Sequence, residues 1–190
     1  MESLTRTITT TSTDETFSLG ERLGLVLEPH DFVGLDGQLG AGKTLFSRGV
    51  ASGAGVPLED VSSPTYSIVQ TYSGRLTLHH ADLYRLATEA DLFATGYFDL
   101  LESDAAMLVE WVSQVPGALP DDALSLRLEV PTPESRRFEI TARGARAQAR
   151  RGRDDLARGG AREAVGTGDE DAVVVLDDLD LDQAREGGSQ

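Results

Sequence analysis

The first 60 residues alternate between the two periodicities that are typical of strands and helices. The β-branched run at residues 4–11 predicts an edge strand. Ser12 and Glu15 match a capping box, and apolar residues at helical spacing follow, so we expect a helix over residues 13–28 with four side chains facing inward: Phe17, Leu19, Leu23 and Leu27. The apolar residues at 32–35 predict a buried strand, and a second helix that begins at residue 43 is expected to end near Gly53.

Short strands dominate the next part of the chain. Residues 67–72 and 75–82 are expected to form a hairpin around a Ser-Gly turn. Thr88 and Asp91 match the start of a helix that runs to Gly96, and the apolar residues 107–111 predict a strand that ends in a carboxylate. Two more strands with alternating character are predicted at residues 123–130 and 136–142. This order indicates an α/β domain with a mixed, mostly parallel sheet flanked by helices.

The composition changes after about residue 144, so we divide the chain into a domain at 1–144 and a tail at 145–190. The tail contains 7 arginines, most of them early, and 11 acidic residues, most of them late, with no aromatic residue. Such a segment cannot bury enough apolar surface to offset the entropy lost on ordering, so we expect it to be disordered. We interpret it as a solubilising tail in which only residues 173–181 have the apolar and acidic character of a docking segment.

Charge and composition exclude several classes of protein. The net charge of −15 argues against direct non-specific binding of nucleic acid, which relies on a basic surface, so we expect any RNA to be held by a partner. The absence of cysteine excludes disulfides and thiolate metal sites. No apolar run approaches membrane-spanning length and the first residues lack an apolar signal core, so a cytoplasmic protein is expected.

Residues 37–44, Gly-Gln-Leu-Gly-Ala-Gly-Lys-Thr, match the phosphate-binding loop pattern G-x-x-x-x-G-K-[ST] between a predicted strand and a predicted helix. Glycines let several backbone N–H groups converge on phosphate oxygens, and the helix adds the positive end of its dipole. The pattern assigns the β- and γ-phosphates to Lys43 and Mg²⁺ to the Thr44 hydroxyl. Lys43 is the only lysine among 17 basic residues, which singles it out further.

A bound Mg-nucleotide also needs carboxylates, usually at the end of a strand beside the loop. Asp82 and Glu110 both fit this position, their spacing does not separate them, and either one is also typical of a helix cap. His80 shares a strand face with Asp82 and would orient it by a hydrogen bond, whereas His79 on the opposite face is interpreted as an ordinary strand histidine. Trp111 is expected to pack near the nucleotide, in the core or against a partner.

The single lysine also bears on which nucleotide is bound. Without a second lysine the Asn/Thr-Lys-x-Asp element that reads guanine cannot exist, so ATP is expected. A small-molecule kinase would need an arginine-rich lid; Arg85, Arg136 and Arg137 would supply charge, but no acceptor site is evident. A nucleotide-sensing interaction module, in which hydrolysis is incidental, is a further alternative.

Four motifs occur in order: the phosphate loop, Ser63-Pro-Thr-Tyr66, His80-Ala-Asp-Leu-Tyr-Arg85 and Glu110-Trp111. In this combination, residues 12–142 resemble the TsaE family (formerly YjeE), small bacterial ATPases with a P-loop NTPase-like fold that are required for the threonylcarbamoyladenosine modification of tRNA. The resemblance implies ATP and Mg²⁺ as cofactors, with slow hydrolysis by the protein alone. It also implies TsaD-like and TsaB-like partners that stimulate hydrolysis, which would reset their complex between modification cycles. Contact with tRNA would be indirect, through these partners.

The resemblance also implies roles for individual residues. Mg²⁺ would be held by Thr44 and Glu110, and catalysis would involve Lys43, with Asp82 polarising or positioning water and Thr65 contacting the γ-phosphate from a switch loop at 63–66. The nucleotide-binding residues would be Gly37, Gly40, Ala41, Gly42, Lys43, Thr44 and Arg136, with Arg137 as the alternative to the last. The adenine would be approached from residues 12–14.

The sequence departs from the family pattern in three places. Ala81 stands where many members have Phe, and Val112 follows Glu-Trp where Pro is frequent, which puts the turn after Trp111 in doubt. The tail after residue 144 matches nothing in the core family.

Overall fold

The structure is a computed structural model that describes residues 4–64 and 67–144. Seven strands of these residues form one mixed sheet in the order β1-β7-β6-β2-β5-β4-β3. Strands β6, β2, β5 and β4 pair in parallel, and antiparallel pairing adds β7 and β1 at one edge and β3 at the other. The predicted α/β fold with a mixed sheet flanked by helices is confirmed, and three of the six strand pairs, those at the centre of the sheet, are parallel. The strands are β1 Leu4–Thr10, β2 Phe32–Gly37, β3 Val69–Ser73, β4 Thr77–Asp82, β5 Ala106–Glu110, β6 Ala123–Glu129 and β7 Arg136–Arg143.

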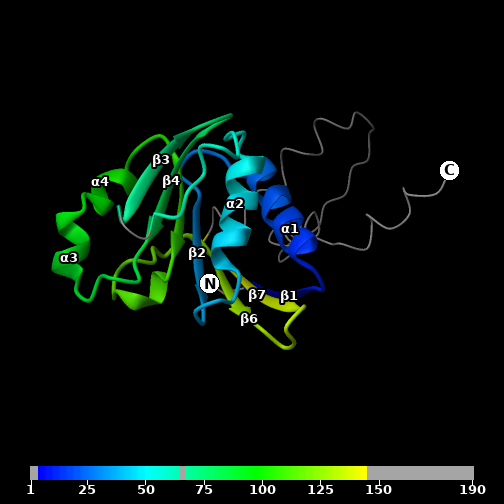
Figure 1. Cartoon of the computed structure of the whole chain (residues 1–190). Helices are drawn as coiled ribbons and strands as arrows, with labels where there is room; N and C mark the ends of the chain where they lie inside the picture. Colours follow the sequence, from blue (N-terminus) through cyan, green and yellow to red (C-terminus); the bar gives the residue numbers. More distant parts are fainter. Residues whose placement is uncertain (1–3, 65–66, 145–190) are drawn as a thin grey trace, which may run out of the picture.

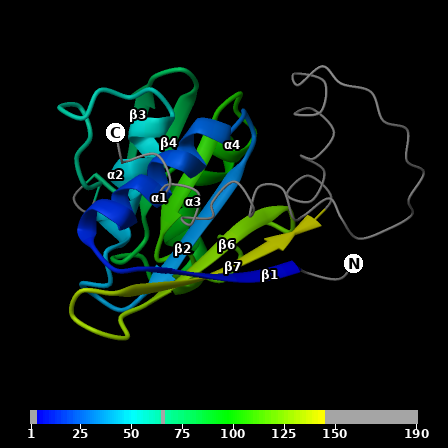
Figure 2. The same cartoon turned by 90° about the vertical axis from the view of Figure 1, so that its right-hand side faces the viewer.

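Helices cover both faces of the central strands (Figures 1 and 2). Helices α1 (Thr13–Val26) and α2 (Lys43–Gly53) lie side by side on one face, and α3 (Glu89–Ala94) and α4 (Tyr97–Leu101) lie on the other, with a 3₁₀ turn η1 at Val112–Gln114. Because both faces are covered, β5 is buried at every position. The largest fully buried side chains come from both layers: Phe46, Phe138, Leu19, Leu23, Leu35, Leu78, Leu108, Leu126 and Leu128 in the layer of α1 and α2, and Tyr97, Leu83 and Leu92 in the layer of α3 and α4.

The backbones of α1 and α2 touch through four glycines, two on each helix: Gly20, Gly24, Gly49 and Gly53. A Cβ added at Gly49 would lie 2.2 Å from the carbonyl oxygen of Phe17, and one added at Gly24 would lie 2.1 Å from that of Val50. These distances are far below van der Waals contact, so no larger residue fits without separating the helices. The helix that begins at the phosphate loop is therefore fixed directly against α1.

The two helix starts that were predicted from capping residues, at Ser12 and Thr88, are present. Ser12 Oγ accepts a hydrogen bond from the Glu15 N–H at 3.1 Å, and the Glu15 carboxylate accepts from the N–H of Thr11 at 2.7 Å. At α3 the capping box is reciprocal, since Asp91 N–H donates to Thr88 Oγ1 at 3.1 Å and Thr88 N–H donates to the Asp91 carboxylate at 3.0 Å. Capping of this kind stabilises a helix by about 1 kcal/mol.

The structure also corrects details of the sequence prediction. The first helix ends at Val26, and Phe17 is only partly buried on its flank. The helix α4 was not predicted; Gly96 (φ 74°) ends α3, and the Tyr97 hydroxyl then donates to the Ala118 carbonyl oxygen at 2.6 Å. The tail at 145–190, with its segment 173–181, lies outside the described residues. Within the described part of the chain, no helix has the length and apolar character needed to cross a membrane.

Candidate nucleotide site at the phosphate loop

The loop between β2 and α2 owes its shape to glycines. Gly37 and Gly42 have φ values of 152° and 102°, in the left-handed region that favours glycine. A Cβ at Gly37 would lie 2.6 Å from a carbonyl oxygen of β6, so only glycine lets β2 pass so close to its neighbour. Gly40 (φ 78°) faces open space, and the buried Ala41 donates its N–H to the Gln38 carbonyl oxygen at 3.1 Å. The loop therefore curls over the start of α2, as phosphate binding requires.

Lys43 lies inside this curl, with 5% of its surface exposed. Its Nζ donates to the carbonyl oxygens of Gly37 at 2.7 Å and Gln38 at 3.1 Å. The ammonium also lies 3.7 Å from the ring centre of Trp111, within the range of a cation–π contact. Burial lowers the pKa of Lys43, although nearby carboxylates, first of all Glu110, act in the opposite direction. Trp111 thus packs at the phosphate loop. From the sequence, a place near the nucleotide was one of three alternatives for this side chain, beside the core and a partner contact.

Glu110 lies directly beneath the loop because β5 is the immediate neighbour of β2. Its carboxylate accepts hydrogen bonds from three side chains: Thr44 Oγ1 to Oε2 at 3.2 Å, Ser47 Oγ to Oε1 at 2.8 Å and His80 Nε2 to Oε1 at 3.0 Å. Burial acts to raise the pKa of Glu110, but hydrogen bonds from these groups and the charge of His80 outweigh it and the net shift is downward. The site therefore favours a carboxylate, not a carboxylic acid, at this position.

Asp82 occupies the corresponding position on the next strand. It is in register with Glu110 across the β4–β5 pair, so both acids lie at the carboxyl end of adjacent parallel strands. The side chain is 6% exposed, and its Oδ1 accepts a hydrogen bond from the N–H of Tyr84 at 3.0 Å. Asp82 is one strand farther from β2 than Glu110 is, so the structure separates two acids that sequence spacing had left equivalent.

The donor set at this edge suits Mg²⁺ bound together with phosphates. Within residues 4–64 and 67–144, no group of three or more His, Asp or Glu side chains could hold a metal by itself. Mg²⁺ at nucleotide sites, however, is held by one or two carboxylates together with phosphate oxygens and water. Glu110 and the hydroxyl of the exposed residue Thr44, whose oxygens are 3.2 Å apart, supply the protein's part of such a set.

The two candidate arginines have different environments. The Nε of Arg136 would lie 3.5 Å from a Cβ placed on Gly42, so this side chain passes directly over the phosphate loop. Its guanidinium donates to the carbonyl oxygens of Pro133 and Ser135 at 3.0 and 2.9 Å. Arg137 instead makes an exposed ion pair with Glu129 of β6. The geometry therefore favours Arg136 as the arginine at the loop.

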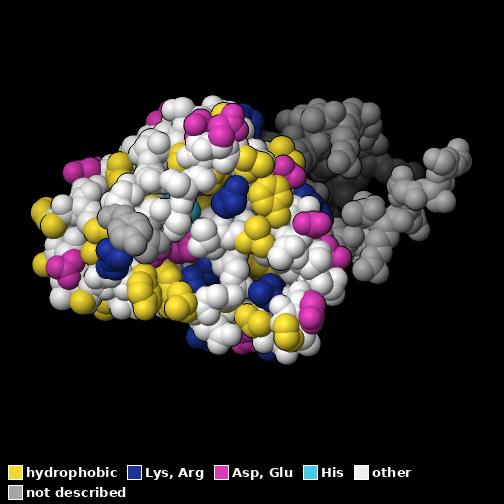
Figure 3. Space-filling view, in the orientation of Figure 1, with side chains coloured by type: hydrophobic (Ala, Val, Ile, Leu, Met, Phe, Trp, Pro, Cys, Tyr) yellow, Lys and Arg dark blue, Asp and Glu magenta, His cyan; other side chains and the backbone are white. Residues whose placement is uncertain are grey.

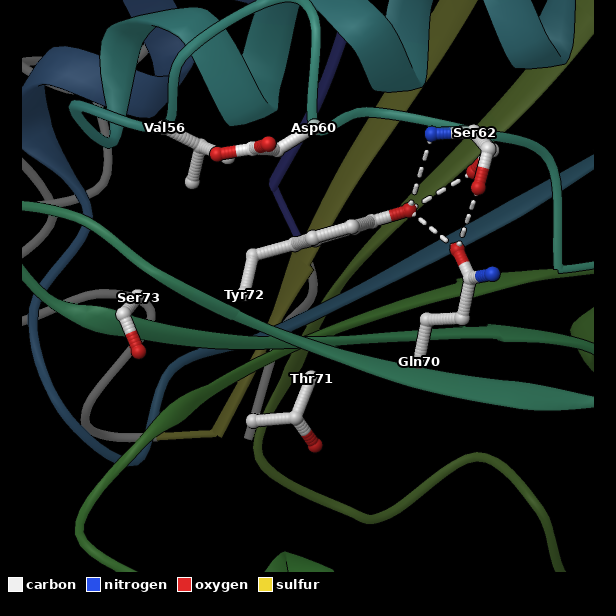
Figure 4. Close-up of a pocket in the computed structure, with 7 residues that line it drawn as sticks. All are labelled: Val56, Asp60, Ser62, Gln70, Thr71, Tyr72 and Ser73. Carbon is white, nitrogen blue, oxygen red and sulfur yellow. Dashed lines mark hydrogen bonds between the residues drawn. The ribbon is translucent and has the colours of Figure 1, made fainter.

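The segment that leads to the predicted switch loop is anchored to β3 (Figure 4). The Tyr72 hydroxyl donates to the Ser62 carbonyl oxygen at 2.6 Å, and the Ser62 N–H lies 3.3 Å from the same hydroxyl. Ser62 Oγ also donates to Gln70 Oε1 at 3.0 Å. These side chains line a hollow of about 470 Å³ that no phosphate-loop residue reaches. Thr65, the predicted γ-phosphate contact, lies outside the described residues.

The two histidines behave differently from one another. His79 lies between two hydroxyls, with Nδ1 2.9 Å from Thr71 Oγ1 and Nε2 2.9 Å from Ser103 Oγ, and burial lowers its pKa. It is a strand histidine, as predicted. His80 was predicted to orient Asp82, but its bond is to Glu110, because the ring reaches across to the neighbouring strand β5. Ser47 was not predicted as a site residue, although it lies one helical turn after Thr44, on the same side of α2.

A parallel central sheet whose strand β2 runs through a G-x-x-x-x-G-K-T loop into a buried helix start defines a protein of the P-loop class. The family model described as "Threonylcarbamoyl adenosine biosynthesis protein TsaE" matches residues 10–138, which include all of β2 to β6 but only the end of β1 and the start of β7. The chain therefore belongs to the TsaE family, whose members take part in the biosynthesis of threonylcarbamoyladenosine in tRNA.

Individual relatives agree with this assignment. The chain is 38% identical over 119 residues to the tRNA threonylcarbamoyladenosine biosynthesis protein TsaE of Treponema pallidum, a match that covers 63% of this chain and 87% of the relative. It is 34% identical over 139 residues to the Bacillus subtilis protein of the same name, covering 72% and 85%. The crystal structure of Bacillus subtilis YdiB has a TM-score of 0.64 and 26% identity, covering 77% of this chain and 90% of YdiB.

Proposed function

We propose that this chain is a Mg²⁺-dependent ATPase that serves the threonylcarbamoyladenosine modification of tRNA together with TsaD-like and TsaB-like partners in the cytoplasm. Family membership supports the pathway. The observation that carries the ATPase is the cluster beneath the loop, in which a buried Lys43 lies beside a Thr44–Glu110 hydrogen bond. That is the combination of ammonium, hydroxyl and carboxylate that P-loop enzymes use on a nucleotide triphosphate.

The residues of the loop would bind the phosphates through their N–H groups and through Lys43. Thr44 and Glu110 would hold Mg²⁺, which when bound supplies positive charge to the β- and γ-phosphates. Since the Thr44 hydroxyl already donates to Glu110, its oxygen lone pairs remain available to a cation. Arg136, which passes over Gly42, would add a second positive side chain at the loop.

Asp82 would polarise or position the water that attacks the γ-phosphate. Its place at the end of β4, one strand beyond Glu110, suits a group that acts beside the metal, with Glu110 as the closer acid. Thr65 stays a predicted γ-phosphate contact. Slow hydrolysis by the protein alone would follow if partner proteins must order the switch loop around it.

An indirect relation to tRNA fits the charge of the chain. The net charge is −15. On the face drawn in Figure 3, basic side chains of the described residues are interspersed with acidic and apolar ones and do not form one basic area. Phosphate backbones are bound through clustered Lys and Arg, so TsaD-like and TsaB-like partners are the better candidates for holding the tRNA.

Steady-state hydrolysis by the purified protein tests the proposal. We expect slow release of phosphate from ATP that requires Mg²⁺ and becomes faster when cognate TsaD-like and TsaB-like proteins are added. The measurement is phosphate release, with and without partners, at matched protein concentrations. The proposal would be contradicted by a hydrolysis rate that is the same with and without the partners, or by transfer of phosphate to a metabolite in place of water.

Substitution of Asp82 by asparagine separates turnover from binding. The amide keeps an acceptor for the Tyr84 N–H but cannot polarise water as a carboxylate does, so we expect kcat to fall by about 100-fold or more. The ATP dissociation constant should change by less than about threefold, because the phosphate contacts remain. Phosphate release and isothermal titration calorimetry measure the two quantities.

Asp36→Asn is the matched control, since Asp36 is another acid near a strand end and its Oδ1 accepts from the N–H and Oγ of Ser113. It should leave kcat nearly unchanged. Equal loss of binding and turnover in Asp82→Asn would make Asp82 a structural residue. Full support of tRNA modification by a variant that binds but does not hydrolyse ATP would favour the nucleotide-sensing alternative.

A further inference from the structure

The two oxygens of the Glu110 carboxylate have different partners. Oε1 accepts from two buried side chains, His80 Nε2 at 3.0 Å and Ser47 Oγ at 2.8 Å. Oε2 faces only the hydroxyl of Thr44, at 3.2 Å, among the partners given by the described residues. Thr44 is exposed, whereas His80 and Ser47 are 1% and 0% exposed. One oxygen is therefore committed to the protein interior, and the other is directed to the edge where the phosphates would lie.

The hydrogen bond fixes the position of one ring proton of His80. A carboxylate only accepts, so Nε2 must carry the proton that it shares with Glu110. The other ring nitrogen, Nδ1, is buried and has no hydrogen-bond partner in the described residues. Burying an unpaired polar atom costs free energy, which an apolar residue of similar size would avoid. The unpaired Nδ1 makes histidine costly at this position, and the one hydrogen bond that the ring makes is from Nε2 to Glu110. A functional role for that hydrogen bond would explain why a histidine is present.

We infer that His80 and Ser47 are positioning residues that hold Glu110 through Oε1 and thereby direct Oε2 to the cation bound with ATP. This inference rests on the proposed function, because it needs Mg²⁺ at Thr44 and Glu110. His80 is on β4 and Ser47 is on α2, so the carboxylate of β5 is held from a neighbouring strand and from the loop helix at once. Groups that orient a metal ligand in this way change metal affinity without touching the metal.

The test is the Mg²⁺ dependence of ATP binding. In His80→Leu and in Ser47→Ala, we expect the Mg²⁺ concentration that gives half-maximal enhancement of ATP binding to rise by about 10-fold to 100-fold. ATP affinity measured in EDTA should stay at the wild-type value, because the loop and Lys43 are intact. His80→Gln carries an N–H at the same distance along the side chain as Nε2, so it should recover most of the lost Mg²⁺ affinity. Calorimetric titration with ATP at a series of Mg²⁺ concentrations gives all of these values without turnover.

His79→Leu is the control, because His79 is the adjacent histidine, is also buried at 6% exposure and bonds to Thr71 and Ser103 on the opposite face of β4. This variant should lower the free energy of unfolding about as much as His80→Leu does. It should leave unchanged the Mg²⁺ midpoint, which is the Mg²⁺ concentration that gives half-maximal enhancement of ATP binding. If His80→Leu does not fold, Ser47→Ala still decides the question. A wild-type Mg²⁺ midpoint in Ser47→Ala, or in a folded His80→Leu, would overturn the inference. If the ATP affinity of the wild-type protein did not depend on the Mg²⁺ concentration, the proposed function would be refuted, and this inference with it.

Discussion

Lys43→Ala is expected to abolish useful ATP binding and the support of tRNA modification. The ammonium is the only charged donor within the loop among the described residues, and charge-assisted hydrogen bonds to two phosphates contribute about 3 kcal/mol or more together. The ATP dissociation constant should therefore rise on the order of 100-fold. Calorimetry measures binding, and mass spectrometry of tRNA nucleosides from complemented cells measures the modification.

Two further variants test whether the shape of the Lys43 side chain matters as well as its charge, and whether the loss of a positive charge elsewhere has the same effect. Lys43→Arg keeps the charge but replaces a compact ammonium by a planar guanidinium, so we expect it to fail as well. Arg143→Ala removes one positive charge at the opposite end of β7 from Arg136 and should bind ATP as the wild type does. Circular dichroism checks that each variant folds. Normal levels of threonylcarbamoyladenosine in cells that contain only folded Lys43→Ala protein would contradict the proposed function.

Gly49→Ala is expected to destabilise the fold by about 3 kcal/mol, since overpacking against backbone atoms cannot be relieved by a side-chain rotation. The new Cβ would lie 2.2 Å from the carbonyl oxygen of Phe17 and 3.0 Å from the backbone nitrogen of Glu21, so α1 and α2 would have to separate. The gain of about 1 kcal/mol from alanine's helix propensity is too small to offset this. Urea unfolding should show a midpoint lower by roughly 1 M or more.

Ser18→Ala isolates the helix-propensity effect, because Ser18 lies on the exposed face of α1. We expect its free energy of unfolding to stay within about 0.5 kcal/mol of the wild type. A Gly49→Ala protein as stable as Ser18→Ala would mean that the helices pack farther apart than the glycine contacts indicate. Because α2 begins at Lys43, Gly49→Ala should weaken ATP binding in proportion to the displacement of the helix start.

Local features of the site could be predicted because each is encoded within a few residues. The loop at 37–44, the capping residues Ser12 and Thr88, and the turn between β3 and β4 are all set by short-range backbone chemistry, and the structure contains each of them. Strand alternation also separated His79 from His80. These signals need no knowledge of which elements become neighbours in the sheet.

Features that depend on strand order could not be predicted in the same way. The sequence does not say that β5 lies between β2 and β4, and that order alone brings Glu110 next to Thr44 and within reach of His80. The choice between Arg136 and Arg137 likewise depends on which face of β7 meets the loop. The short helix α4 has too few residues for a clear periodicity and owes its place to the burial of Tyr97.

The burial of the only lysine has a practical consequence for studying how the site opens. A protease specific for lysine has one cleavage site in this chain, the Lys43–Thr44 peptide bond, at the first turn of α2. Cleavage requires local unfolding of the loop and the helix start, so its rate at low protease concentration reports the population of opened molecules. A bound nucleotide must slow that rate by the free energy it adds to the closed loop. Cleavage after Lys43 therefore measures local stability at a single site, the phosphate loop and the start of α2.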